Sequence, residues 1–120
     1  MREQLLMSVL SDLNATSTDI TASAVISTDG LPIATLMPKQ LDADRVGAMS
    51  ATLLALGNHA AAELACGDLD QVMVKGKTGY ILLNQAGPDA VLALMAKESG
   101  KLGLILLDAK RAAKHIADVI

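Results

Sequence analysis

The residues most suggestive of chemistry are Gly76, Lys77 and Thr78, which resemble the end of a phosphate-binding P-loop. That motif requires another glycine at position 71, where this chain has Gln71, and a helix that begins directly after the loop. Residues 80–85 instead form a short apolar run that is typical of a strand. We therefore interpret residues 76–78 as the turn of a β-hairpin, and we expect no nucleotide site there.

Other reactive side chains occur singly. Cys66 is the only cysteine, so it has no partner for a disulfide or a metal site, and we expect a small buried residue. His59 has only Glu63 one helical turn away and is expected to contact a partner or solvent. Asp29 precedes Gly30, as in a tight turn. No Ser/His/Asp or Cys/His set is recognisable, so we expect no catalytic residues, no metal and no cofactor, and an enzyme is the least expected function.

Composition narrows the classes of function. The 120 residues are 52% hydrophobic, which suits one folded domain with a real core. The net charge is -3, the basic residues are scattered and Tyr80 is the only aromatic residue, which argues against nucleic-acid binding. No apolar run reaches the roughly 20 residues of a membrane span, and the N-terminus does not resemble a signal peptide. We expect a cytoplasmic protein without a membrane span.

Hydrophobic periodicity predicts eight elements in the order α-β-β-α-β-β-β-α. The predicted helices cover residues 2–14, 42–65 and 102–120, and the predicted strands cover residues 20–28, 31–36, 69–75, 79–85 and 90–96. Residues 102–107 also have the composition of a strand, but the helical spacing continues beyond them and favours a helix. Tight turns join most strands, so the sheet is expected to be mostly antiparallel, in an α+β layered domain.

Several residues mark the expected ends of these elements. The polar residues 14–19 should interrupt the chain between the first helix and the first strand. Pro32 lacks an N–H, which places its strand at a sheet edge. Asp42 is a candidate N-cap for the long helix, Gly67 suits its end, and Ser99 is a candidate cap for the last helix.

The long helix has three distinct faces. The largest apolar side chains form the face expected to pack on the chain's own sheet: Val46, Met49, Leu53, Leu56, Ala60 and Leu64. Small residues around one leucine form the second face: Gly47, Ala51, Leu54, Asn58, Ala61 and Ala65. The third, thinly polar face includes Asp44, Arg45, Ala48, Thr52, Ala55 and His59.

The small-residue face permits a close contact with a second copy of the chain. The predicted strand 69–75 is a second sheet edge and is expected to contribute Gln71 and Met73 to the same two-fold interface. The alternative is an alanine-rich surface that only reflects helix propensity.

Five stretches, taken in order, resemble the Roadblock / dynein light chain family. They are residues 29–34, 49–57, 69–74, 79–80 and 102–113, and the resemblance covers the chain from Leu5 to Val119. It implies a five-stranded antiparallel sheet sandwiched by helices, as in Roadblock and profilin-like folds. It also implies a homodimer built from the long helix and the third strand.

The resemblance implies a binding partner as well. Members of the family bind Ras-like small GTPases or act as scaffolds, and a bacterial gliding-polarity member is a GTPase-activating protein. We therefore expect a regulator or platform for a Ras-like GTPase. The GTPase is expected to contact the third face of the long helix, from Asp44 to His59. Arg45 as a trans-acting arginine finger is a minor hypothesis. A scaffold without effect on hydrolysis is the alternative, and a small-molecule sensor is a third.

Overall fold

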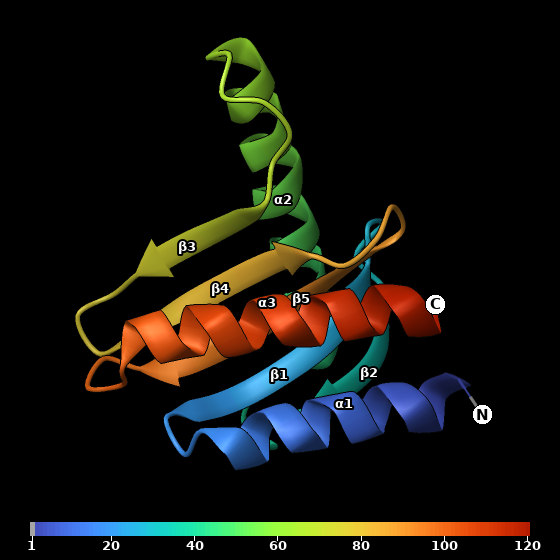
Figure 1. Ribbon diagram of the computed structural model, residues 1–120, viewed down its shortest axis with the longest axis vertical. Helices are drawn as coiled ribbons and strands as arrows, with labels where there is room; N and C mark the ends of the chain where they lie inside the picture. The colour runs from blue at the N-terminus through green and yellow to red at the C-terminus, as the bar shows by residue number, and fades with distance from the viewer. Residues whose placement is uncertain (1) are drawn as a thin grey trace.

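The computed structural model describes residues 2–120 and contains the eight predicted elements in the predicted order (Figure 1). The helices are α1 (Arg2–Thr16), α2 (Ala43–Glu63) and α3 (Leu102–Val119). The strands are β1 (Ile20–Ser27), β2 (Pro32–Leu36), β3 (Gln71–Lys75), β4 (Gly79–Gln85) and β5 (Ala90–Lys97). The α+β prediction is therefore confirmed, including a helix rather than a strand at residues 102–107.

The five strands form one antiparallel sheet in the order β2-β1-β5-β4-β3. Pro32 lies on the edge strand β2, as its missing N–H predicted, and β3 is the other edge. At the β1–β2 turn, Gly30 has a φ of +94° and its N–H donates to the Ser27 carbonyl at 2.9 Å. The Gly76 N–H donates to the Gly79 carbonyl at 2.8 Å, which confirms a hairpin turn at residues 76–78.

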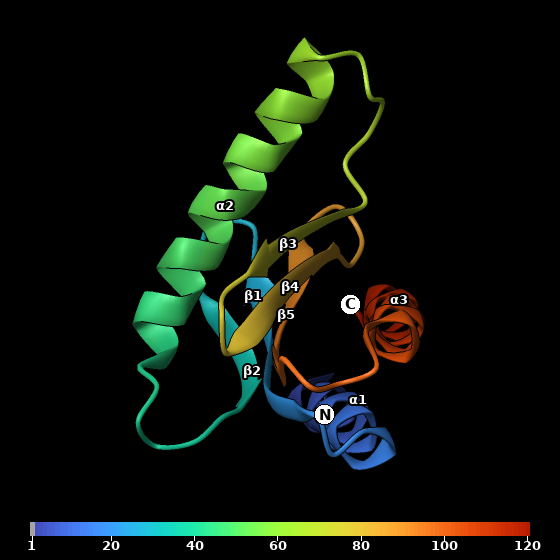
Figure 2. The ribbon, with the colours of Figure 1, turned by 90° about the vertical axis from the view of Figure 1, so that its left-hand side faces the viewer.

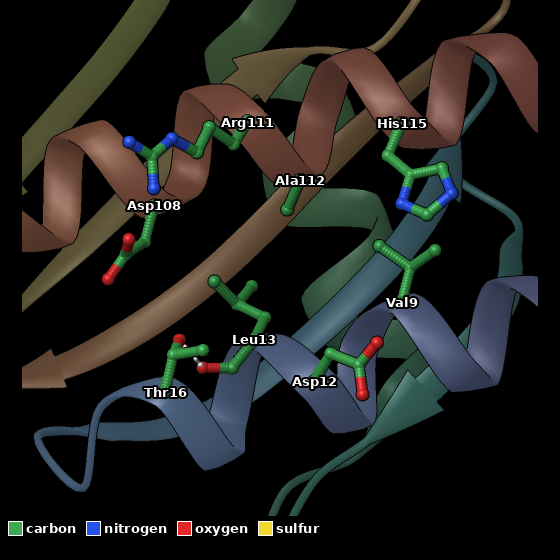
Figure 3. Close-up of a pocket in the computed structure, with 8 residues that line it drawn as sticks. All are labelled: Val9, Asp12, Leu13, Thr16, Asp108, Arg111, Ala112 and His115. Carbon is green, nitrogen blue, oxygen red and sulfur yellow. Dashed lines mark hydrogen bonds between the residues drawn. The ribbon is translucent and has the colours of Figure 1, made fainter.

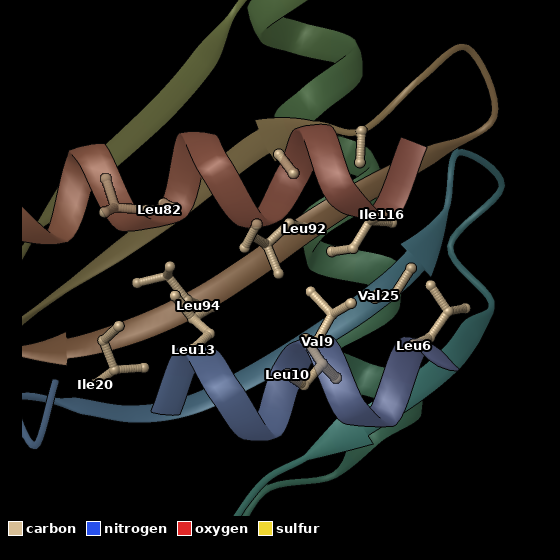
Figure 4. Close-up of a cluster of buried hydrophobic side chains, with 14 of the residues drawn as sticks. Leu6, Val9, Leu10, Leu13, Ile20, Val25, Leu82, Leu92, Leu94 and Ile116 are labelled. Carbon is tan, nitrogen blue, oxygen red and sulfur yellow. The ribbon is translucent and has the colours of Figure 1, made fainter. Parts of the chain in front are cut away.

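The sheet separates two hydrophobic clusters. Figure 2 shows α1 and α3 on one face of the sheet and α2 on the other. The larger cluster lies between the sheet and α1 and α3, and Figure 4 shows part of it, including Leu6, Leu10, Leu92 and Ile116. The smaller cluster lies under α2 and includes Ala24, Ile26, Val46, Leu54, Leu83, Val91 and Ala93. Through these two clusters, all three helices pack against the sheet.

Two predicted boundaries are wrong. Helix α1 continues past the predicted end at residue 14 to Thr16, and polar groups there have partners: Asn14 Oδ1 accepts a hydrogen bond from Ser23 Oγ at 2.9 Å, and Thr16 Oγ1 donates to the Leu13 carbonyl at 2.8 Å. Lys101, rather than Ser99, is the N-cap of α3, and no side chain caps that helix. The predicted cap of α2 is confirmed, because Asp42 Oδ1 accepts hydrogen bonds from backbone N–H groups of the first turn.

The prediction of which α2 face packs on the sheet is right for Val46 and Leu53, which belong to or pack against the smaller cluster, and wrong for the rest of that face. The buried residues of α2 are Val46, Gly47, Ser50 and Leu54. Three large side chains expected in the core are exposed instead, Met49 at 52%, Leu56 at 63% and Leu64 at 73%. The small-residue face thus supplies much of the contact with the chain's own sheet.

A close backbone contact explains this orientation of α2. A Cβ built on Gly47 would collide with the Gly30 carbonyl oxygen and lie 3.2 Å from the Gly30 carbonyl carbon. Further along the helix, a Cβ on Gly57 would lie 2.8 Å from Val72 Cγ2 and 3.1 Å from Leu69 Cδ2. Glycines at these two positions let α2 lie close to the sheet, which turns the bulkier side chains outward.

The C-terminus of α2 ends earlier than Gly67. Ala65 adopts a φ of +57°, its N–H donates to the Ala62 carbonyl at 3.3 Å, and the Cys66 N–H donates to the Ala61 carbonyl at 2.8 Å. This is the Schellman arrangement, with alanine at the left-handed position that glycine usually occupies. Cys66 follows it and is exposed, so the expectation of a buried cysteine is wrong.

We expect Gly47→Ala to destabilise the protein, because the new methyl group would push α2 away from the β1–β2 turn. Overpacking of this kind costs about 1–3 kcal/mol, beyond the helix propensity gained by alanine. Chemical denaturation monitored by circular dichroism measures the change. Gly103→Ala is the matched control, since a Cβ on this exposed helical glycine meets nothing within 4 Å. It should stabilise by up to about 1 kcal/mol, and equal effects of the two variants would contradict the backbone contact.

We expect Ala65→Gly to stabilise the protein by about 0.5–1 kcal/mol, because glycine adopts a left-handed backbone without the steric cost of a Cβ. The same denaturation experiment measures this gain. Ala62→Gly, one turn earlier in regular helix, should have the opposite sign. A loss of stability in Ala65→Gly would mean that α2 does not end in the left-handed turn.

Candidate interaction surface

The six residues predicted to contact a partner lie together on the outward face of α2. Asp44, Arg45, Ala48, Thr52, Ala55 and His59 are all exposed and follow helical spacing. Asp42 fixes the start of this stripe, since its Oδ1 accepts from the N–H groups of Asp44 at 3.0 Å and Arg45 at 3.4 Å. Thr52 Oγ1 donates to the Ala48 carbonyl at 2.9 Å, so its hydroxyl hydrogen is already used within the helix.

An apolar strip runs beside these six residues. It consists of the exposed side chains Met49, Leu56, Ala60 and Leu64. Sequence reasoning assigned them to the core and missed them as surface residues. The signal that could have identified them is the scarcity of charge on α2, because a helix that is apolar around most of its circumference is usually covered on more than one side.

The C-terminal half of α2 extends beyond the sheet. Figures 1 and 2 show this half projecting past β3, and no residue from Ala55 to Glu63 is buried. At Gly57 the helix still meets residues near the sheet edge, since a Cβ there would lie 2.8 Å from Val72 Cγ2 and 3.1 Å from Leu69 Cδ2. The chain therefore presents about two turns of helix, with Ala60 and Leu64 on its exposed apolar side, in which no residue is buried.

The edge strand β3 lies beside this projection. It pairs with β4 only, so one side of its backbone carries no neighbouring strand. Its side chains are also largely exposed, including Gln71, Met73 and Val74. An open edge next to an uncovered helix is suited to strand addition from another chain.

The residues predicted for a dimer interface separate into two groups. Gly47 and Leu54 are buried within their own chain, and Ala51 and Ala61 are half-buried. Gly47 and Leu54 pack against the sheet of their own chain. Their predicted place in an interface between two chains is therefore wrong. Asn58, Gln71 and Met73 are exposed; Asn58 follows Gly57, which meets Val72, and Gln71 and Met73 flank Val72 on β3.

A shallow groove between α1 and α3 lies on the other side of the sheet (Figure 3). It has a volume of about 180 Å³, with an apolar floor of Val9, Leu13 and Ala112. Polar residues from both helices surround it: Asp12, Asp108, Arg111 and His115. The Thr16 hydroxyl at its rim already donates to the Leu13 carbonyl.

Residues 2–120 contain no group of three or more His, Cys, Asp or Glu side chains placed to hold a metal ion. None of the helices in this range is long and apolar enough to cross a membrane.

Comparison with known proteins places this geometry in a family. Residues 7–96 match the Roadblock/LC7 domain. An uncharacterized protein of Methanocaldococcus jannaschii is 39% identical over 108 residues, which cover 90% of this chain and 93% of the relative.

Solved structures with low sequence identity share the fold. The gliding protein MglB from Thermus thermophilus superposes with a TM-score of 0.90 at 21% identity, covering 98% of this chain and 90% of that one. A structure described as MglB with tetrameric arrangement gives 0.88 at 20% identity, covering 98% and 89%. Acanthamoeba castellanii profilin II gives 0.69 at 16% identity, covering 94% and 97%. The domain match and the fold of the present chain agree, and this chain belongs to the Roadblock/LC7 family.

Proposed function

We propose that this protein is a homodimeric regulator or binding platform for a Ras-like small GTPase. The observation that carries the proposal is the uncovered apolar strip of α2, where Leu56 and Leu64 are each more than half exposed. Isolated exposed leucines are ordinary, but a continuous apolar strip on a projecting helix marks a surface for another protein. The likeness to MglB and the family membership support the kind of partner proposed.

The second copy of the chain is the first proposed partner. A two-fold axis beside β3 would pair the two β3 edges and place each projecting half of α2 near the other copy's sheet. Asn58, Gln71 and Met73 are exposed and would lie at that junction. Leu56 and Leu64 would then lose contact with water, which is the main source of free energy for such an association.

The GTPase would contact the polar stripe that contains Arg45, Thr52 and His59. These side chains point away from the sheet, so a dimer would present two copies of the stripe on one continuous surface. The stripe has no free loop that carries an arginine. We therefore propose that the dimer acts by holding the GTPase's own catalytic residues in place, rather than by supplying a finger from Arg45.

The proposed dimer predicts a mass of twice 12.4 kDa in light scattering coupled to size-exclusion chromatography. The double variant Leu56→Asp with Leu64→Asp should run as a folded monomer, because burial of uncompensated carboxylates would weaken association by roughly 100-fold or more. Leu31→Asp with Leu104→Asp, two exposed leucines on other surfaces, is the matched control and should remain dimeric. A monomeric wild type, or a dimeric Leu56→Asp/Leu64→Asp variant, would contradict this interface.

The GTPase proposal is tested by retention of a Ras-like GTPase on the immobilised protein, followed by single-turnover GTP hydrolysis with and without the dimer. We expect accelerated hydrolysis and a loss of roughly tenfold in binding for Arg45→Ala with His59→Ala, since each lost polar contact costs about 0.5–1.5 kcal/mol. Arg111→Ala, on the other side of the sheet, should have no effect. A loss of about 10³-fold or more in the hydrolysis step from Arg45→Ala alone would instead indicate an arginine finger.

The second candidate function is a non-catalytic scaffold or adaptor subunit. The observation that favours it is the apolar character of the strip beside the stripe, which serves docking without requiring chemistry. Equal retention of the GTPase in its GDP and GTP states, without accelerated hydrolysis, would select this function. If no GTPase is retained in either nucleotide state, the regulator proposal is wrong.

A further inference from the structure

The β1–β2 turn presents a large apolar side chain to solvent. Leu31 is 67% exposed, and among the large hydrophobic side chains of residues 2–120 only Leu64 is more exposed. One exposed leucine is ordinary in a soluble protein. Its significance therefore depends on how firmly the residue is held and on which residues lie beside it.

The backbone at Leu31 is held by hydrogen bonds in both directions. The Leu31 N–H donates to Ser27 Oγ at 3.0 Å, and the Ser27 N–H donates to the Leu31 carbonyl at 2.8 Å. The preceding residue, Gly30, donates its N–H to the Ser27 carbonyl at 2.9 Å. Because the backbone is already fixed, a contact at Leu31 orders little additional chain, which lowers the entropic cost of binding.

The turn that carries Leu31 lies against the polar stripe of α2. Figure 2 shows the β1–β2 turn beside this helix. A Cβ built on Gly30 would lie 3.5 Å from Ala48 Cα and 3.4 Å from Ala51 Cβ. Ala48 is a member of the polar stripe, so the turn borders the surface proposed for the GTPase.

The polar stripe has no large apolar side chain of its own. Ala48 and Ala55 are small, and the Thr52 hydroxyl hydrogen is already used within the helix. Protein interfaces gain most of their binding energy from a few large side chains, surrounded by weaker polar contacts. The apolar strip on α2 is assigned to the second copy of the chain, so Leu31 is the large apolar residue that the turn adds to the stripe.

The proposed dimer leaves this turn accessible. That dimer forms along β3, whereas β2 is the opposite edge of the sheet. The turn meets α2 at residues 47–51, in the N-terminal half of the helix, whereas the projecting half begins near Ala55. A second copy and a GTPase can therefore bind at the same time.

We propose that Leu31 on the β1–β2 turn is the apolar anchor of the GTPase contact, next to Arg45 and His59 on the stripe. This inference rests on the proposed function. The GTPase surface that fits has an apolar patch for Leu31, bordered by hydrogen-bond acceptors for Arg45 and His59. Asp29 is exposed on the same turn, so a basic side chain of the GTPase would complete the contact.

The experiment measures the affinity of the Ras-like GTPase most strongly retained on the immobilised protein, for the wild type and for variants of Leu31. Leu31→Ala should weaken binding roughly tenfold or more, because it removes most of a side chain that the contact buries. Leu31→Met keeps an apolar side chain of similar volume and should stay within roughly threefold of the wild type. Leu104→Ala is the matched control: this leucine is 56% exposed on α3, on the other face of the sheet, and its loss should change binding less than about twofold.

Two further measurements separate a direct contact from an indirect effect. Each variant should keep the mass of a dimer and the unfolding midpoint of the wild type, because Leu31 is exposed. With methyl-labelled leucine, the Leu31 signals should shift in NMR spectra when the GTPase is added, and the Leu104 signals should not.

The outcomes distinguish this inference from the proposed function. If Arg45→Ala with His59→Ala weakens binding but Leu31→Ala changes it less than about twofold, the anchor is wrong and the regulator proposal stands. A monomeric Leu31→Ala variant would place the residue in the dimer interface and also overturn the inference. If no GTPase is retained in either nucleotide state, the proposed function fails and the anchor fails with it.

Discussion

The contact between Gly47 and Gly30 is the constraint on which the arrangement of α2 depends. The helix backbone reaches the β1–β2 turn with no space for a side chain between them. Such an approach fixes both the position of the helix and its rotation about its own axis. Val46, Ser50 and Leu54 then face the sheet, and the side chains of Met49 and Leu56 are left outside.

The same contact explains why half of α2 has no sheet beneath it. A helix of 21 residues is about 31 Å long, whereas five strands span about 19 Å between the outer two. Anchored at Gly47 beside β1 and β2, the helix reaches β3 by Gly57, where Val72 and Leu69 meet it. The remaining residues extend past the edge, so an uncovered apolar surface follows from helix length and anchor position together.

Local sequence patterns were sufficient to predict the helices and strands but not the rotation of α2 about its own axis. The hairpin turns, the edge position of Pro32, the Asp42 cap and the α+β order all depend on residues near each other in the sequence, and all were predicted. The rotation of α2 depends on Gly47 and Gly30, which are distant in the sequence, and apolar residues surround most of that helix. Periodicity favoured the largest side chains as the core face, although close packing here required the smallest.

The exposure of Cys66 and the unpaired amide of Asn84 were beyond sequence reasoning for the same reason. Cys66 resembles a core residue by type, but it follows the left-handed turn at Ala65 on the part of the chain that projects beyond the sheet. Asn84 lies in an apolar run, and only the placement of α3 shows which groups surround it. In both cases the neighbours come from a different element.

The sheet separates two surfaces with different physical requirements. On the α2 side, the uncovered residues are apolar and form a long strip, so only a large partner can remove them from water. On the α3 side, the core is filled where α1 and α3 pack over β1 and β5, but Ala113 and Ala117 leave a space over β4. That space is lined by charged and polar side chains, Asp70, Lys110 and Lys114 among them. The two faces of the sheet can differ in this way because successive side chains of one strand point to opposite faces.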